Sequence, residues 1–579
     1  MSKKRNKGSI KNIWLITREY SRLAGVGGVK DVSRQLAGAL AGSGRKVSVV
    51  LPLYGFMDPA ELNLDPLDIS FFVDMNYVTI ERHEPVRIWS IKHHASINTA
   101  CGNGLPGPAL KKEGEKKKDV TIYFIDSPRF RDKKRVYTYT VEEEEENPDH
   151  CQGAGHHDYF AMNVLLQKSA LALMVLLSEK PDIIHCQDGH TAILPAMMRE
   201  IEGYRHYFRK SGAVVTIHNA GRGYHQDVGD HAFAKAICAI GSRTIKNNLL
   251  DGMFNPFLAA SSYAVLNTVS ENYARELTET DDDELTGWLG HRLVARGFSL
   301  QGITNGINPD HFDLSSPEKL GLPKGAAVQI SPEINSCTST VSRQARRKKT
   351  AQKGGVYLPD KKKCLEFLVN IIADNKLGGI RKDGSLDFHP DQPLFTWIGR
   401  FTPQKGMDIL VTALEVLLSR DRDFQTVILG TGAKEIEESL LCLTENRENS
   451  GRICLLRGFD SVFANRIYAA GDFFLIPSRY EPCGLTDFIA QLFGNIPIVH
   501  HTGGLVKVID NETGFAYQEH SSQALINTIQ KAMHMFRNSP DKIAKMQLNA
   551  LKRIYNHYNW NIVMDKYLDL YQEALSLTA

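Results

Sequence analysis

Short apolar runs alternate with helical patterns along most of the chain. Apolar runs in the first half cover residues 12–17, 46–54, 86–94, 120–126, 181–187, 213–219 and 263–270, and helical patterns include 32–41 and 159–177. The second half repeats this alternation, with runs at 394–401, 424–432, 452–459, 473–480 and 496–504. Such alternation predicts parallel sheets with helices on both faces. We therefore expect two α/β domains facing a cleft, with ligands bound at the carboxyl ends of the strands.

Three stretches interrupt this rhythm. Residues 102–119 predict a long hairpin or loop, and residues 141–150 predict an acidic loop. Residues 314–391 contain a polar, basic run at 339–355 that is typical of a surface insertion or linker. An amphipathic pattern near the end of the chain predicts a packed helix. The expected division is a domain at 1–320, an irregular linker at 321–390, a second domain at 391–560 and a helix at 561–579.

Composition narrows the class of protein. Hydrophobic residues make up 42% of the chain and charged residues 23%, which is ordinary for a globular protein. A formal net charge of +3 is small for 579 residues and gives no sign of a nucleic-acid or membrane partner. The nine cysteines include no CxxC pair, and the N-terminus lacks a signal-peptide pattern. We expect a cytoplasmic protein with reduced thiols, and its oligomeric state stays open.

A glycine-rich stretch, LAGVGGVKDV at residues 23–32, directly follows the first predicted strand. It matches neither the GxGxxG fingerprint nor the P-loop pattern. One interpretation is a tight turn into a helix. The other is that Gly27 and Gly28 present bare backbone N–H groups to a phosphate or a developing charge.

The second half carries more specific chemistry. Arg400 ends a predicted strand and Lys405 follows in a turn, an arrangement that suits a diphosphate, although exposed surface cations are common. Glu481 directly follows another strand, where a carboxylate can accept hydrogen bonds from sugar hydroxyls. The residues after it open a helix, and Thr502–Leu505 forms a second glycine turn.

The motifs PSRYEPCGLT (477–486) and HTGGL (501–505) resemble the signature of the bacterial glycogen synthase and plant starch synthase family. GRFTPQKGMDIL (399–410) is similar to the phosphate-binding segment of that family. Four other segments resemble the family in order, and the likeness covers most of 10–320 and 390–560; these segments are 185–198, 214–221, 267–276 and 302–312. The resemblance implies retaining glucosyltransferases with the two-domain GT-B fold.

The resemblance also implies roles for particular residues. Arg400 and Lys405 would hold the nucleotide diphosphate and offset its charge as it leaves. Glu481 would lie beside donor-binding backbone, and His218 would reach the transferred glucose, although it could simply be a hydrogen-bonded histidine at a strand end. The other expected binding residues are Gly27, Gly28, Asp31, Asp188, His190, Asn305, Phe459 (stacked on adenine), Cys483, Gly484, Leu485, Thr486, Thr502, Gly503 and Gly504.

Two departures from the family lie in the N-terminal half. Gly25 stands where the family has the lysine of Lys-x-Gly-Gly-Leu, and Lys30 comes five residues later. Asp188-Gly189-His190 replaces Asp-Trp-His, which removes an aromatic wall. A gain in rate on restoring lysine at Gly25 would indicate a decayed enzyme, and a loss or no change would indicate an adapted loop.

The expected reaction is transfer of glucose from ADP-glucose to an α-1,4-glucan. Only Glu481 is placed by a motif, so a two-carboxylate glycosidase is not indicated; the resemblance implies a same-face displacement without cofactor or metal. The acidic run Thr280–Leu285 is interpreted as a polar loop rather than a metal site. The alternatives are another nucleotide sugar, a small acceptor, or a weakly active regulatory paralogue that binds glucan or nucleotide. An epimerase would not explain the two signature motifs.

Overall fold

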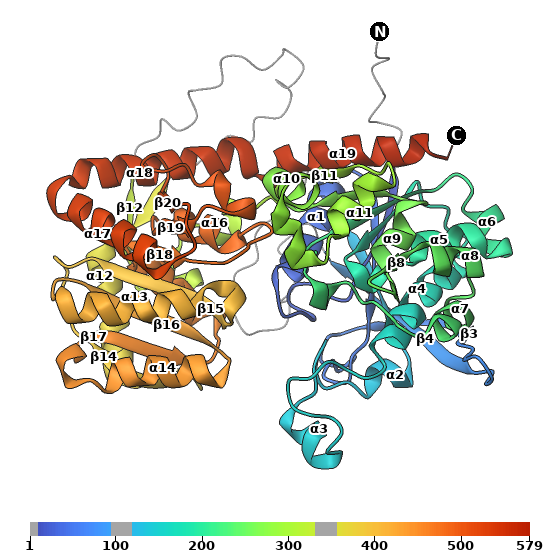
Figure 1. The fold of residues 1–579 in the computed structure, drawn as a ribbon, viewed down its shortest axis with the longest axis horizontal. Helices are drawn as coiled ribbons and strands as arrows, with labels where there is room; N and C mark the ends of the chain where they lie inside the picture. The colour runs from blue at the N-terminus through green and yellow to red at the C-terminus, as the bar shows by residue number, and fades with distance from the viewer. Residues whose placement is uncertain (1–9, 94–118, 331–355, 579) are drawn as a thin grey trace, which may run out of the picture. The chain divides into compact units, whose positions relative to one another are not determined.

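The chain folds into two compact units (Figure 1). The structure, a computed structural model, describes residues 10–93, 119–330 and 356–578. Unit 1 contains the described residues through Gly306 and those from Trp560 onward, and unit 2 contains those from Ile307 to Asn559. The loop expected at 102–119, apart from its last residue, and the whole basic run at 339–355 lie outside the described residues.

Unit 1 is built on a nine-stranded sheet in the order β11-β10-β7-β6-β1-β2-β5-β4-β3. Its strands are β1 Asn12–Ile16, β2 Lys46–Pro52, β3 Asp65–Asp74, β4 His83–His93, β5 Val120–Asp126, β6 Ile183–Gln187, β7 Gly212–Ile217, β10 Val265–Thr268 and β11 Leu300–Gly302. Its helices are α1 Gly28–Gly42, α2 Pro128–Arg131, α3 Val141–Glu146, α4 Tyr159–Leu176, α5 Leu194–Glu200, α6 Glu202–Tyr207, α7 His231–Cys238, α8 Ser242–Asn247, α9 Pro256–Ser261, α10 Glu271–Glu279, α11 Leu289–Ala295 and α19 Trp560–Ser576. A small hairpin joins β8 Leu249–Leu250 to β9 Met253–Phe254. Among the described helices, α4 alone is long and apolar enough by composition to cross a membrane, and most of it is buried within unit 1.

Unit 2 is built on a seven-stranded sheet in the order β14-β17-β16-β15-β18-β19-β20. Alternate residues of its strands face two separate cores: Val427 and Leu429 pack with α12, α15 and α16, whereas Ile428 packs with α13, α14 and α17. The sheet is therefore covered on both faces, as expected. Its strands are β14 Arg381–Leu386, β15 Leu394–Phe401, β16 Gln425–Gly432, β17 Arg452–Arg457, β18 Phe473–Ile476, β19 Ile496–His500 and β20 Phe515–Tyr517, and β12 Ala327–Gln329 pairs with β13 Tyr357–Pro359. Its helices are α12 Lys361–Ala373, α13 Met407–Arg420, α14 Lys434–Glu445, α15 Ser461–Ala470, α16 Leu485–Leu492, α17 Ser522–Asn538 and α18 Pro540–Arg553.

The structure confirms two α/β domains with largely parallel sheets but differs from the sequence in detail. Strand β4 runs antiparallel to both β3 and β5, and β14 runs antiparallel to β17. The acidic stretch expected to be a loop contains α3, which begins with a capping box. The Thr140 hydroxyl accepts the Glu143 N–H, and the Glu143 carboxylate accepts the Thr140 N–H. This cap stabilises a helix despite five consecutive glutamates.

The expected boundaries also shift. Residues 307–320 belong to unit 2, and residues 356–386 are not irregular. Helix α12 buries Leu365, Leu368 and Ile372 in the core of unit 2, at the spacing of one helical face. The helix begins with Lys361, Lys362 and Lys363, which resemble a continuation of the basic run. The apolar face of α12 was therefore not recognised in the sequence.

The last helix, α19, returns to unit 1 (Figure 1). It packs on β7 and α1. The Trp560 indole N–H donates to Gln35 Oε1 at 2.8 Å. His185 Nδ1 lies 2.9 Å from the Tyr571 hydroxyl, and His185 Nε2 lies 2.7 Å from Thr216 Oγ1. A buried histidine therefore fixes the C-terminal helix to strands β6 and β7.

With glutamine in place of His185, the protein should lose less folding stability as the pH becomes acid. Burial lowers the pKa of His185 to about 3, whereas an imidazole in the unfolded chain has a pKa of about 6.5. Between these values the unfolded state binds a proton that the folded state does not, so the stabilisation is present above about pH 6.5 and is lost as the pH falls toward 3. Each pH unit in that window should cost about 1.4 kcal/mol through this group. Urea unfolding at pH 7.5, 6.0 and 5.0 measures the slope, and equal slopes in variant and wild type would contradict the prediction.

Candidate active site

Two groups of side chains, one in each unit, contain the residues expected from the sequence. In unit 1, the loop between β1 and α1 closes around the buried carboxylate of Glu19. Glu19 Oε2 accepts the N–H groups of Val26 (2.8 Å) and Gly27 (3.2 Å), and Oε1 accepts the Tyr137 hydroxyl at 2.6 Å. The Gly27 N–H is therefore not bare in this structure, because it donates a hydrogen bond to Glu19. Gly28 is exposed and begins α1, and contacts of either glycine with a substrate stay a prediction. Glu19 was missed, although a carboxylate just past the first strand was a usable signal.

Gly25 lies against Glu19 and Lys30. Its φ is +152°, and a Cβ at this position would lie 2.7 Å from Glu19 Oε2 and 2.7 Å from Lys30 Cβ. The aliphatic part of Lys30 thus occupies the space that a side chain at position 25 would need. A larger side chain at position 25 would therefore clash with both Glu19 and Lys30 in this loop.

Gly25→Lys should lower activity and stability rather than restore either. The new side chain would displace the Glu19 carboxylate and require a backbone conformation that favours glycine, at a cost of about 1–3 kcal/mol. Thermal unfolding and transfer assays measure both effects. Gly27→Ala is the control within the same loop, because a Cβ there meets nothing within 4 Å. Recovery in Gly25→Lys/Lys30→Ala would assign part of the loss to Lys30, and a rate above wild type in Gly25→Lys would contradict the prediction.

The altered Asp188-Gly189-His190 motif follows β6. A Cβ on Gly189 would lie 2.7 Å from the His225 carbonyl oxygen and 2.8 Å from that of Tyr224, so the position has no room for an aromatic residue. The ring of Tyr137 stacks on that of His190 instead, with centroids 4.9 Å apart and planes 29° apart. Tyr137 therefore supplies an aromatic surface beside the motif from a different segment.

His218, at the carboxyl end of β7, is buried and neutral. Its Nε2 lies 2.7 Å from Gln187 Oε1, and burial lowers its pKa to about 3. Asp188 Oδ1, Gln187 Nε2 and Asn305 Oδ1 are buried without a hydrogen-bond partner among the described residues. Such atoms are rare in folded proteins, and at strand ends they can bind a ligand rich in hydroxyl groups.

Two expected acidic residues of unit 1 have raised pKa values. Burial, together with the negative charge of Glu19, raises the pKa of Asp188 to about 8. Burial also raises the pKa of Asp31, in the first turn of α1, although the charge of Lys30 opposes the shift. Both carboxyl groups therefore hold a proton more readily than exposed ones, which suits hydrogen bonding to hydroxyls.

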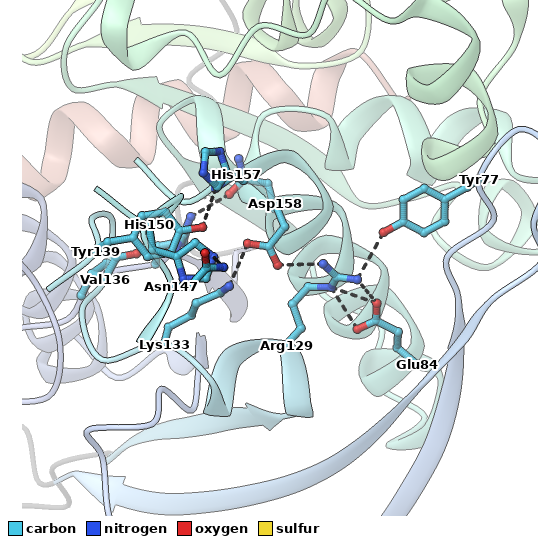
Figure 2. Close-up of polar contacts among 12 residues, drawn as sticks. Tyr77, Glu84, Arg129, Lys133, Val136, Tyr139, Asn147, His150, His157 and Asp158 are labelled. Carbon is cyan, nitrogen blue, oxygen red and sulfur yellow. Dashed lines mark hydrogen bonds and ion pairs between the residues drawn. The ribbon is translucent and has the colours of Figure 1, made fainter. Parts of the chain in front are cut away.

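An ion-pair network anchors the segment that carries Tyr137 (Figure 2). Arg129 donates to both Glu84 oxygens, to Asp158 Oδ2 at 2.7 Å and to the Tyr77 hydroxyl at 3.2 Å. Lys133 Nζ lies 2.9 Å from Asp158 Oδ1. Further along, the ring of Tyr139 stacks on that of His150 (centroids 4.1 Å apart), and its hydroxyl accepts the backbone N–H of His157. These contacts bind the 127–158 segment to β4 and to the start of α4.

In unit 2, Lys405 and Glu481 form an ion pair. Lys405 Nζ donates to Glu481 Oε2 at 2.6 Å, and Ser478 Oγ donates to the same oxygen at 3.0 Å. Lys405 follows β15 and Glu481 follows β18, neighbouring strands whose carboxyl ends lie at one edge of the sheet. The structure thus brings together two residues that are 76 positions apart. Arg400, near the end of β15, is exposed.

The turn that contains Lys405 is tightly packed. Gly406 has a φ of +68°, and a Cβ there would lie 1.9 Å from the Pro477 carbonyl oxygen. The Arg479 N–H donates to the Gln404 carbonyl at 2.9 Å. The backbone that precedes Glu481 therefore holds the Lys405 turn in place.

The two glycine turns of unit 2 also pack directly on each other. A Cβ on Gly503 would lie 2.0 Å from the Glu481 carbonyl oxygen, and one on Gly504 would lie 2.3 Å from that of Cys483. The Gly504 N–H donates to the Glu481 carbonyl at 2.8 Å. The structure places the other expected residues of these turns next to them: Gly484 is the N-cap of α16, Leu485 and Thr486 form its first turn, and Thr502 precedes Gly503.

Phe459 lies after β17, with 69% of its surface accessible. An aromatic ring held in solvent next to the carboxyl end of a strand is free to stack on a planar ligand. Its stacking on adenine stays a prediction.

The acidic run before Trp288 serves a structural role. Asp283 is buried and accepts the backbone N–H groups of Gly290 and His291. In the part of the chain that the structure describes, no group of three or more histidine, cysteine or acidic side chains could hold a metal ion. The seven described cysteines form no disulfide with one another.

Comparisons with known proteins agree with this arrangement. Residues 12–291 match the starch synthase catalytic domain, and residues 381–552 match glycosyl transferases group 1. Glycogen synthase of Moorella thermoacetica is 26% identical over 97% of this chain and 96% of its own length. Glycogen synthase of Lactococcus lactis is 28% identical over 94% of this chain and 96% of its own length. The catalytic domain of starch synthase IV from Arabidopsis thaliana, solved bound to ADP and acarbose, shares the fold with a TM-score of 0.69 at 22% identity, over 98% of this chain and 100% of that one.

The two α/β units and the residues at the ends of their strands define a glycosyltransferase with the GT-B fold. The starch synthase match lies in the first half of the chain and the glycosyl transferases group 1 match in the second. The curated relatives align with nearly the full length of the chain. The chain belongs to the glycogen synthase and starch synthase family.

Proposed function

We propose that this protein transfers glucose from ADP-glucose to the non-reducing end of an α-1,4-glucan with retention of configuration. The observation that carries the proposal is the Lys405–Glu481 pair, held at the carboxyl ends of β15 and β18 beside the residues that open α16. A cation and helix-opening amides at one sheet edge suit a diphosphate. The names of the relatives support glucose as the transferred group.

In this mechanism Lys405 and Arg400 stabilise the negative charge that develops on the leaving diphosphate. Glu481 keeps the Lys405 ammonium at a fixed position and can accept a sugar hydroxyl. No metal is needed in the proposal, because the two side chains supply the positive charge. The leaving phosphate itself removes the proton of the acceptor hydroxyl.

On the sugar side, we assign the hydroxyl contacts to the unit 1 group. His218 is neutral and can exchange hydrogen bonds with a hydroxyl without adding charge. The unpartnered oxygens of Asp188 and Asn305 would gain partners from the glucose. Phe459 would stack on the base, and the reaction would take place in the cytoplasm.

The test is incorporation of labelled glucose into glycogen by the purified chain, with ADP-glucose and UDP-glucose compared in the presence of EDTA. We expect incorporation from ADP-glucose, release of the label as maltose by β-amylase, and no effect of EDTA. Lys405→Met is the inactive control. Incorporation from UDP-glucose alone would contradict ADP-glucose as the donor. A product resistant to β-amylase would contradict the α-1,4 linkage.

A regulatory protein that binds glucan or nucleotide is the second candidate. The use of the Gly27 N–H by Glu19 favours it, because that amide is then not available to a donor. Glycogen or ADP binding without any transfer by the wild-type chain would support this candidate over the first.

A further inference from the structure

Lys507 lies buried between the two glycine turns of unit 2. Its side chain is 5% exposed, and that of Asp487, 2.9 Å from its Nζ, is 0% exposed. Nζ donates to the carbonyl oxygens of Gly484 at 2.9 Å, Gly504 at 3.0 Å and Cys483. Neither residue was singled out in the sequence, because the function expected of these turns required only their glycines.

The ammonium has three protons and contacts three carbonyls, so its hydrogen-bonding capacity is filled by the two turns. Asp487 therefore pairs with it chiefly through charge, and Asp487 Oδ2 also accepts the Gln491 side-chain N–H at 3.0 Å. Nζ lies 4.5 Å from the centre of the Phe488 ring, which adds a cation–π contact. Burial alone would lower the pKa of Lys507, yet Asp487 raises it above its usual value, so the ammonium stays charged.

The carbonyls that Lys507 binds fix the direction of the neighbouring amides. In a planar trans peptide the N–H points opposite to the C=O. Drawing the carbonyls of Cys483 and Gly484 toward Lys507 turns the N–H groups of Gly484 and Leu485 away from it. These are the N–H groups that open α16, where an anion is favoured.

We propose that Lys507, with Asp487 as its counter-ion, is a positioning residue for the donor diphosphate. It joins the 483–484 turn to the 503–504 turn and orients the amides of Gly484 and Leu485. The part that concerns the donor rests on the function proposed above. Lys507 acts on the site through its hydrogen bonds to the three carbonyls, and not through direct attraction between its charge and the ligand.

Two variants separate positioning from simple stability. Lys507→Met leaves the Asp487 carboxylate buried without its partner and should destabilise unit 2. Lys507→Met/Asp487→Leu removes both charges, so thermal stability should recover while the three carbonyl contacts stay absent. Lys531→Met is the matched control, since Lys531 pairs with Asp510 at 3.1 Å and lies 5.6 Å from the Phe515 ring, but at the surface of the same unit.

The first readout is amide hydrogen exchange of residues 482–486 and 503–506 in the ligand-free chain. The second is calorimetric affinity for ADP, together with KM and kcat for ADP-glucose. In the double variant we expect faster exchange in both turns and an ADP affinity lower by about tenfold to a hundredfold, the effect of misplacing binding groups by about 1 Å. KM for the donor should rise with it, while KM for glycogen stays unchanged.

Wild-type exchange and wild-type ADP affinity in the double variant would overturn the proposal. If the wild-type chain binds no ADP, the proposed donor is wrong, and the exchange rates still decide whether Lys507 orders the turns. Faster exchange with unchanged ADP affinity would overturn the link to the donor. The two proposals can therefore fail separately.

Discussion

Lys405→Met is expected to lower kcat/KM for glucosyl transfer by about 10³, because removing one preorganised charge-stabilising group typically costs this much. The loss has two causes. The cation disappears, and the Glu481 carboxylate that it held at 2.6 Å remains as an unpaired negative charge beside the diphosphate. Steady-state transfer to glycogen measures the effect, with Lys434→Met, an exposed lysine on α14, as control.

A double-mutant cycle gives the decisive comparison. Glu481→Gln removes the carboxylate charge, so the double variant Lys405→Met/Glu481→Gln should be no slower than Lys405→Met alone. Additive losses would mean that the two residues act independently, contrary to their pairing in the structure. Retention of more than about a tenth of wild-type kcat/KM in Lys405→Met would remove Lys405 from the charge-stabilising role.

Gly503→Ala should destabilise unit 2 by about 2–4 kcal/mol and abolish most activity, because backbone strain and a backbone clash act together. The new Cβ would lie 2.0 Å from the Glu481 carbonyl oxygen, at a φ of +52°. Relieving that contact must move Glu481 or break the hydrogen bond from Gly504. Urea unfolding and transfer rates measure the two effects.

Gly378→Ala isolates the contribution of backbone strain. Gly378 has a φ of +58°, nearly that of Gly503, but a Cβ there meets nothing within 4 Å. This control should cost only about 1 kcal/mol and leave activity intact. Equal destabilisation by the two substitutions would show that the close packing of the glycine turns adds nothing.

Much of the fold could be predicted because buried parallel strands appear as continuous apolar runs. The runs at 394–401 and 424–432 correspond to β15 and β16, and the helical pattern at 159–177 corresponds to α4. The antiparallel direction of β4 could not be predicted, since an apolar run does not indicate whether the strand lies parallel or antiparallel to its neighbours. Helix α12 was missed because its apolar face begins within a lysine-rich segment.

The candidate site could be predicted where a motif names its residues and not where contacts join distant segments. Lys405 and Glu481 were found through their motifs, but their pairing was not. The Tyr137 hydroxyl donates to Glu19, which lies 118 positions earlier in the sequence. The residues around Tyr137 in the sequence do not indicate that partner. The sequence could show that lysine is absent at Gly25, but only the structure shows that Lys30 fills the space.

The return of α19 to unit 1 has a consequence for how the protein is made. The described residues of unit 2 all lie between Ile307 and Asn559, whereas unit 1 needs α19, which comes after them, to cover β7 and to meet His185. On the ribosome, where folding proceeds domain by domain during synthesis, the second unit can therefore complete its core before the first. A premature stop at the Trp560 codon would leave unit 2 whole and unit 1 unfinished, although unit 1 begins first along the chain.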